Sequence, residues 1–205
     1  MPAELGFRLL VAAVLAAFVG HRAYYTRRLQ RSRAVDHLRT QVAPQSRLGG
    51  LAGLTAFAST LVYLIRPDWI QWAQMQLPAW LRGTGLIVAL GGFALLQWSQ
   101  AALGSNWSDE PRLLAGQTMV AHGAYKWIRH PIYAAFLLIL GSTMLLSANG
   151  LVGGSWIAMV ALDVRARIAF EERLMLAAFG EKYQEYMDMT GAIVPHFRLR
   201  RNPNE

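Results

Sequence analysis

Residues 125–133, with the sequence YKWIRHPIY, set an arginine, a histidine and a proline directly before an apolar run, YAAFLLILGSTMLL. Pro131 suits the first position of a helix, where its missing N–H costs nothing, so His130 is predicted to be the N-cap. The free N–H groups at such a helix start favour an anion, and Arg129 would strengthen that preference. The segment therefore predicts a site for a carboxylate or a phosphate.

A second polar group lies about forty residues downstream, between Arg165 and Glu172. Arg167 and Glu171 are four residues apart and share one face of a helix, where an ion pair is worth about 0.2–0.5 kcal/mol. Charges at the edge of an apolar helix are costly unless they are paired or face a wet cavity. A simple ion pair on the helix surface and a polar functional site are both consistent with this pattern.

Several residues of YKWIRHPIY have a second interpretation as a membrane-surface belt. Aromatic and cationic side chains gather where a helix leaves the bilayer. On this interpretation the belt consists of Tyr125, Lys126, Trp127, Arg129 and Tyr133. The residue types alone favour neither interpretation over the other.

Other kinds of chemistry are excluded by residue content. The chain has no cysteine, which excludes disulfides, thiolate nucleophiles and zinc–thiolate sites. No pair of histidines has the spacing of metal ligands, so no metal is predicted. We expect the separate histidines His21, His37 and His196 at the surface or at an interface.

The elements that position these clusters are five apolar runs. Of 205 residues, 54% are hydrophobic and 16% are charged, whereas soluble domains have about 25% charged residues. A helix needs roughly 20 residues to cross a bilayer, and about 17 is the lower limit. We therefore expect an all-α polytopic membrane protein, a single domain over residues 1–205, with about five transmembrane helices. The runs are 5–21, 49–65, 83–103, 132–148 and 150–169.

The distribution of cations predicts the orientation of these helices. Seventeen of the 20 Lys and Arg residues fall in the segments 22–47 and 104–131 and from residue 165 onward. The positive-inside rule then places the N-terminus outside, and both long loops and the C-terminus in the cytoplasm. The net charge of +8 therefore indicates membrane topology, and no nucleic-acid partner is expected.

The fifth run is predicted to form a tight hairpin with the fourth and to continue into an amphipathic helix. SANGLVGG, between the two runs, is rich in turn residues. Beyond the fifth run, apolar and aromatic residues recur at a 3–4 spacing up to Tyr186, and Gly191 and Pro195 end the helix.

Two motifs together resemble the isoprenylcysteine carboxyl methyltransferase family. GAYKWIRHPIY meets that family's pattern G-x-Y-x-x-x-R-H-P-x-Y. EERLMLAAFGEKYQEYMDMTGAIVPHF follows its E-E-x-x-L-x-x-x-F-G-x-x-Y-x-x-Y tail, with Met175 at the leucine position. LGSNWS is similar to the family's upstream segment, so the resemblance covers residues 103–197: a loop, the hairpin and the C-terminal helix. It implies a multi-pass membrane enzyme whose active site faces the cytoplasm and which transfers methyl from S-adenosylmethionine to the carboxylate of a prenylated cysteine.

The resemblance also implies site residues. Arg167 falls where the family binds its lipidated substrate, and Glu171 shares the catalytic role. Gln117 stands where eukaryotic members have histidine, and its amide can still hydrogen-bond a purine or ribose. The implied cofactor-binding residues are Gln117, Thr118, Met119, Val120, Tyr125, His130, Pro131, Ile132, Tyr133 and Glu171.

Three alternatives remain open at this point. The methyl acceptor could be another membrane nucleophile, such as a phospholipid amine, a thiol or a small lipid. A sterol-reductase-like enzyme that uses NADPH has a similar C-terminal half, but such chains are roughly twice as long as this one. A non-enzymatic helical bundle would need no cofactor at all.

Overall fold

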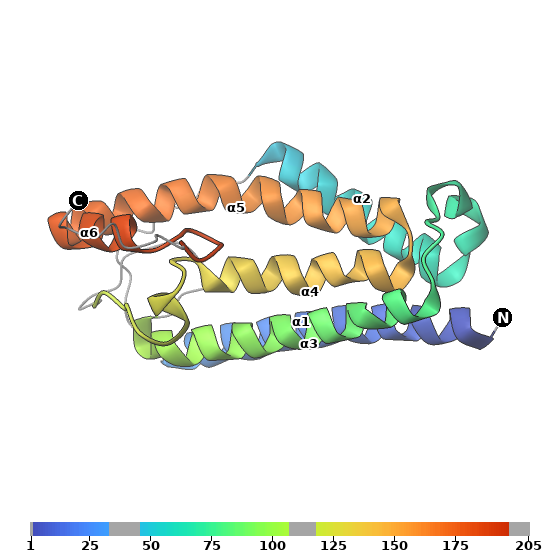
Figure 1. The fold of residues 1–205 in the computed structure, drawn as a ribbon, viewed down its shortest axis with the longest axis horizontal. Helices are drawn as coiled ribbons and strands as arrows, with labels where there is room; N and C mark the ends of the chain where they lie inside the picture. The colour runs from blue at the N-terminus through green and yellow to red at the C-terminus, as the bar shows by residue number, and fades with distance from the viewer. Residues whose placement is uncertain (1, 33–45, 107–117, 197–205) are drawn as a thin grey trace, which may run out of the picture.

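The computed structural model describes residues 2–32, 46–106 and 118–196, and this part of the chain consists of helices joined by short connections. Figure 1 shows them as an elongated bundle in which α4 lies between α5 and α3, with the N-terminus at one end and α6 at the other. The elements are α1 (Pro2–Ser32), α2 (Arg47–Ile65), η1 (Pro67–Ala73), α3 (Ala79–Leu103), η2 (Gly104–Asn106), η3 (Gly123–Lys126), α4 (Pro131–Ser147), α5 (Gly150–Phe179) and α6 (Glu181–Met189).

All five predicted apolar runs are helical, so the all-α class is confirmed. Three helices are long and apolar enough to cross a membrane: Ala3–Arg28 within α1, Arg47–Ile65 and Ala79–Leu103. Helix α4 is apolar but has only 17 residues, and α5 extends ten residues beyond the predicted run, into charged sequence. Helix α1 is longer than its predicted run at both ends because the flanking polar residues continue the helix.

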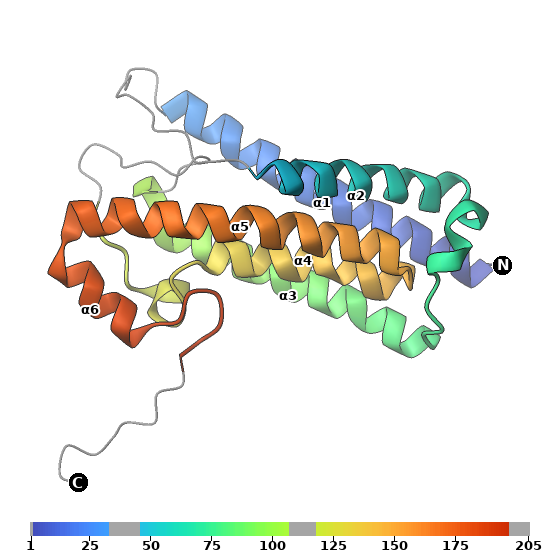
Figure 2. The same ribbon diagram turned by 90° about the horizontal axis from the view of Figure 1, so that it is seen from above.

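Small residues allow α3, α4 and α5 to pack closely. A Cβ at Gly92 would lie 2.7 Å from the Ile139 side chain, and a Cβ at Gly153 would lie only 2.2 Å from the Cα of Met144. Asn149 lies in the short turn between α4 and α5, as predicted for the hairpin. It is the N-cap of α5, because its Oδ1 accepts from the N–H groups of Leu151 and Val152. Figure 2 shows the hairpin from above, with α2 beside α5.

A buried ion pair fastens the end of the bundle where the chain begins. Arg82 is 7% exposed, and its guanidinium donates to Glu4 at 2.7 and 3.1 Å. It also donates twice to the Leu146 carbonyl, at 2.9 and 3.1 Å, and its Cζ lies 3.9 Å from the centre of the Phe7 ring. Tyr63 donates a further hydrogen bond to Glu4 at 3.0 Å. These contacts join α1, α2, α3 and α4.

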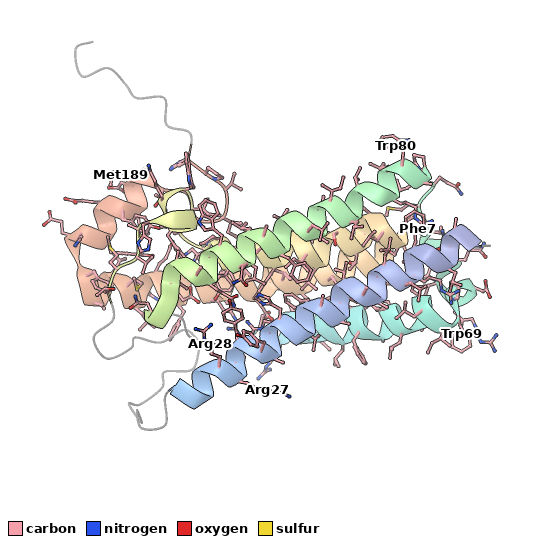
Figure 3. The ribbon with its side chains drawn as sticks, turned by 90° about the horizontal axis from the view of Figure 1, so that it is seen from below. Phe7, Arg27, Arg28, Trp69, Trp80 and Met189 are labelled. Carbon is pink, nitrogen blue, oxygen red and sulfur yellow. The ribbon has the colours of Figure 1, made fainter. Side chains whose placement is uncertain are left out.

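The two ends of the bundle differ in their exposed side chains. Figure 3 shows Trp69 and Trp80 at the end where the chain begins, and Arg27 and Arg28 at the opposite end, toward α6. The two tryptophans are 70% and 72% exposed, so they face the surroundings rather than the core. Exposed arginines of α1 thus lie at the α6 end of the bundle.

The prediction of one continuous helix from the fifth run to Tyr186 is wrong at Gly180. Helix α5 ends at Phe179, because Gly180 has a φ of +55° that interrupts helical geometry, and α6 starts anew at Glu181. Only α6 is the separate C-terminal helix, and it buries Tyr183 and Tyr186 against the bundle. The break lets the chain turn back toward the start of α4, as Figure 2 shows.

Candidate active site

The start of α4 has the predicted form. Pro131 is the first helical residue and His130 is the N-cap, both of them buried. The His130 side chain makes no capping hydrogen bond to the helix. Its backbone N–H donates to the Ala192 carbonyl at 2.9 Å. Its imidazole points toward α5, where it contacts two glutamates.

His130 is held between two carboxylates of α5. Its Nδ1 lies 3.3 Å from Oε2 of Glu171, and its Nε2 lies 3.3 Å from Oε1 of Glu172. Burial lowers the pKa of His130, but the hydrogen bonds and charges of the two glutamates outweigh it and raise this pKa above its usual 6.5. An acceptor beside each ring nitrogen favours the protonated imidazolium, which donates on both sides.

Arg129 has a different role from the predicted one. We expected its guanidinium to attract an anion, but it is committed to protein acceptors. It donates to Glu172 Oε1 at 2.8 Å, to the Met187 carbonyl at 2.9 Å and to the Thr190 carbonyl. Burial alone would raise the pKa of Glu172, but its hydrogen bonds to His130 and Arg129 lower it below the usual value. Sequence spacing contained no signal for these long-range contacts.

Glu171 faces an aromatic group. The Tyr133 hydroxyl donates to Glu171, and the Tyr133 ring stacks on His130 with centroids 5.9 Å apart. Burial, reinforced by the charge of Glu171, raises the pKa of Tyr125 well above its usual value. Arg167 lies close enough to Tyr133 to act on its hydroxyl. The structure thus brings together Tyr125, His130, Tyr133, Arg167 and Glu171, as the sequence predicted.

The other predicted site residues are less closely grouped. Gln117 lies outside the described residues. Thr118 is exposed, and its backbone N–H donates to Asn106 at 3.0 Å, so the asparagine of LGSNWS fixes the start of this segment. Met119 and Val120 are half-buried, and Ile132 packs against the main core cluster rather than the charged groups.

The belt interpretation survives only for part of YKWIRHPIY. Trp127 is 56% exposed, and the Lys126 ammonium lies 5.9 Å from the centre of its ring. Tyr125 is buried instead, and its carbonyl accepts from the Tyr186 hydroxyl at 2.6 Å. Tyr186 therefore joins α6 to the site, a role that its place on the apolar face of the predicted helix did not reveal.

Two of the three separate histidines lie within the described residues. His21 contacts Gln97 at 3.3 Å between α1 and α3, and His196 is exposed. His37 lies outside the described residues.

The fold and the site define a helical bundle of membrane-spanning type with a cluster of charged and aromatic groups at one end. Residues 85–177 match the model of the isoprenylcysteine carboxyl methyltransferase family. The resemblance predicted from the two motifs is therefore confirmed, and both His130 and Glu171 lie within the matched part.

Three individual relatives match this chain, two of them isoprenylcysteine methyltransferases by name. The chain is 28% identical over 118 residues to a protein-S-isoprenylcysteine O-methyltransferase of Tribolium castaneum and 30% identical over 119 residues to that of Homo sapiens. It is also 31% identical over 130 residues to a methanethiol S-methyltransferase of Mycobacterium tuberculosis. These alignments cover 57%, 57% and 62% of this chain and 42%, 42% and 46% of the relatives. The chain thus spans less than half the length of these curated relatives.

One solved structure shares the fold. The eukaryotic intramembrane Ras methyltransferase matches 95% of this chain and 68% of its own, with a TM-score of 0.70 and 20% sequence identity. The likeness extends over the N-terminal helices, which carry neither of the two motifs.

Proposed function

We propose that this protein is a membrane-embedded methyltransferase that moves a methyl group from S-adenosylmethionine to a lipid-linked acceptor, a carboxylate of the prenylcysteine type. One observation carries the proposal: the segment that matches the family and the polar cluster are the same part of the molecule. His130, Tyr133 and Glu171 come from two helices within residues 85–177 and contact one another.

The groups at this site fit the proposed cofactor. S-adenosylmethionine has a cationic ammonium and a sulfonium, which need an anion and aromatic faces. Glu171 keeps 26% of its side chain exposed, and the rings of Tyr125 and Tyr133 lie near it. Thr118–Val120 would hold the adenosine portion. When bound, the cofactor supplies a methyl group activated by its positive sulfur.

Arg167 is the residue proposed to bind and orient the acceptor. A carboxylate is ionised at neutral pH, so it needs a cation to place it and no general base to activate it. Arg167 lies near the Tyr133 hydroxyl, on the same helix as Glu171 and one turn before it. The apolar half of the bundle would receive the acceptor's lipid chain.

We further infer that all five long helices cross the bilayer, with the N-terminus outside and the site at the cytoplasmic surface. The arginines gathered at the site's end support this orientation, because cationic residues favour the cytoplasmic side. Because the chain has no cysteine, single cysteines report it directly. In sealed inverted vesicles Lys182→Cys should react with an impermeant maleimide and Trp72→Cys should not; the reverse labelling would refute the orientation.

Ligand binding tests the cofactor assignment. Calorimetry of the detergent-purified protein should show binding of S-adenosylmethionine and S-adenosylhomocysteine and none of NADPH. Glu171→Gln should weaken S-adenosylmethionine at least about tenfold through the lost charge–charge contact. Glu185→Gln, an exposed carboxylate of α6, is the matched control. A folded protein that binds neither adenosyl compound would sink the proposal.

Acceptor chemistry needs its own assay. Transfer of labelled methyl to a farnesylcysteine analogue should exceed transfer to phosphatidylethanolamine or to methanethiol, and Arg167→Gln should reduce the first selectively. Methanethiol is included because two relatives carry that acceptor in their names. Faster labelling of the thiol or the amine would overturn the choice of carboxylate while leaving the enzyme class intact.

A further inference from the structure

The segment that follows α6 lies across the start of α4. We call residues 190–193 the strap. The backbone N–H of Arg129 donates to the Gly191 carbonyl at 2.9 Å, and the N–H of His130 donates to the Ala192 carbonyl at 2.9 Å. Ile128 and Gly191 form a parallel bridge. The strap thus pairs with the backbone of the site's central histidine.

The Arg129 side chain holds the strap through hydrogen bonds. Its guanidinium donates to the Met187 and Thr190 carbonyls, at the end of α6 where helix carbonyls lack partners within the helix. A cation at a helix C-terminus is also favoured by the helix dipole. The same guanidinium donates to Glu172, which contacts the far side of the His130 ring. One planar group therefore links the strap, α6 and the imidazole.

The strap packs against the same apolar cluster as Tyr133. Ile193 packs against the cluster of Leu140, Val160 and Val164, and Tyr133 packs against the same cluster. The tight turn of the strap depends on Gly191, because a Cβ there would overlap the Val194 carbonyl oxygen. The backbone geometry of the strap therefore requires glycine at position 191.

We propose that Arg129 is a positioning residue that closes the site with the strap. It sets the orientation of His130 through Glu172 and holds Ile193 against the apolar cluster that Tyr133 also contacts, without contacting cofactor or acceptor itself. This inference rests on the proposed function for what the site binds, whereas the clamping of the strap by Arg129 is independent of it.

Hydrogen exchange of the full chain in detergent tests the clamp without any ligand. Arg129→Lys keeps the charge but loses the planar guanidinium, which donates to three acceptors. Amides of residues 188–193 should exchange at least about tenfold faster in this variant, while those of α1 to α3 keep their wild-type rates. Lys126→Gln, which removes an exposed cation three residues earlier, should leave all rates unchanged.

Affinity and kinetics then test the effect on the site. Arg129→Lys should weaken S-adenosylhomocysteine about tenfold, and Gly191→Ala should raise KM for the acceptor more than it lowers kcat. Unchanged strap exchange in Arg129→Lys would overturn the inference, as would faster exchange spread evenly over all helices. If wild type bound no adenosyl compound, the proposed function would fail, and strap exchange alone would decide on the clamp.

Discussion

Arg82→Met is expected to lower the free energy of unfolding by about 3 kcal/mol. The Arg82 side chain is 9% exposed, and it makes five hydrogen bonds: two to Glu4, two to the Leu146 carbonyl and one to the Tyr63 hydroxyl. Breaking a buried ion pair by removing one partner costs about 3–5 kcal/mol. Glu4 is 36% exposed, so water can solvate its abandoned carboxylate in part, which favours the lower end of this range.

A double-mutant cycle measures the pairing itself. Unfolding in mixed SDS micelles, followed by the fluorescence of the seven tryptophans, gives the free energies of wild type, Arg82→Met, Glu4→Gln and the double variant. The destabilisation of the double variant should be about 2 kcal/mol smaller than the sum of the two single destabilisations, since each single variant already removes the same pair. Arg66→Met is the matched control, because Arg66 is an exposed arginine near this end of the bundle and should change stability by less than about 0.5 kcal/mol.

Two results would refute this reasoning about Arg82. One is a cost below about 0.5 kcal/mol; the other is strict additivity with Glu4→Gln. Binding of S-adenosylhomocysteine, measured where the variant is fully folded, should stay at the wild-type value, because the pair lies at the end of the bundle opposite α6.

Two further predictions concern the site and the hairpin that supports it. The His130–Glu172 contact should stabilise the fold most between pH 4.5 and 6.5, because its benefit is lost as pH rises through the raised pKa of His130 or falls through the lowered pKa of Glu172. The stability difference between wild type and Glu172→Gln, followed from pH 4 to 9, would contradict this if it were flat. Gly153→Ala should destabilise the hairpin by about 1–3 kcal/mol or more, since the new methyl overlaps the Met144 backbone. Gly154→Ala, with open space around it, should be neutral or slightly stabilising in the same unfolding assay, and equal effects would contradict the packing argument.

Much of the fold could be predicted because helix formation in apolar runs is a local property. The start of α4 was predicted to the residue, since proline fixes its own φ and lacks an N–H. The break at Gly180 was missed because apolar spacing continues smoothly from Leu176 to Tyr183, and a single glycine within such a pattern has no obligatory conformation.

The site could be predicted only where neighbouring residues carry the chemistry. His130, Tyr133 and Glu171 were expected at one site because the two motifs resemble the segments that form the family's cofactor site. The commitment of Arg129 to Glu172 and to two carbonyls of α6 depends on contacts between residues 43 to 61 positions apart. Spacing along one helix contains no information about such contacts.

The separation between Arg129 and its carbonyl partners also has a consequence for biosynthesis. The Thr190 carbonyl is made 61 residues after Arg129, which corresponds to roughly 3 to 12 seconds at ribosomal rates of 5–20 residues per second. On the topology proposed above, α4 and α5 enter the bilayer in that interval while the guanidinium stays hydrated. On that topology the nascent chain completes its apolar bundle before its polar end, and the last assembly step takes place in water rather than in lipid.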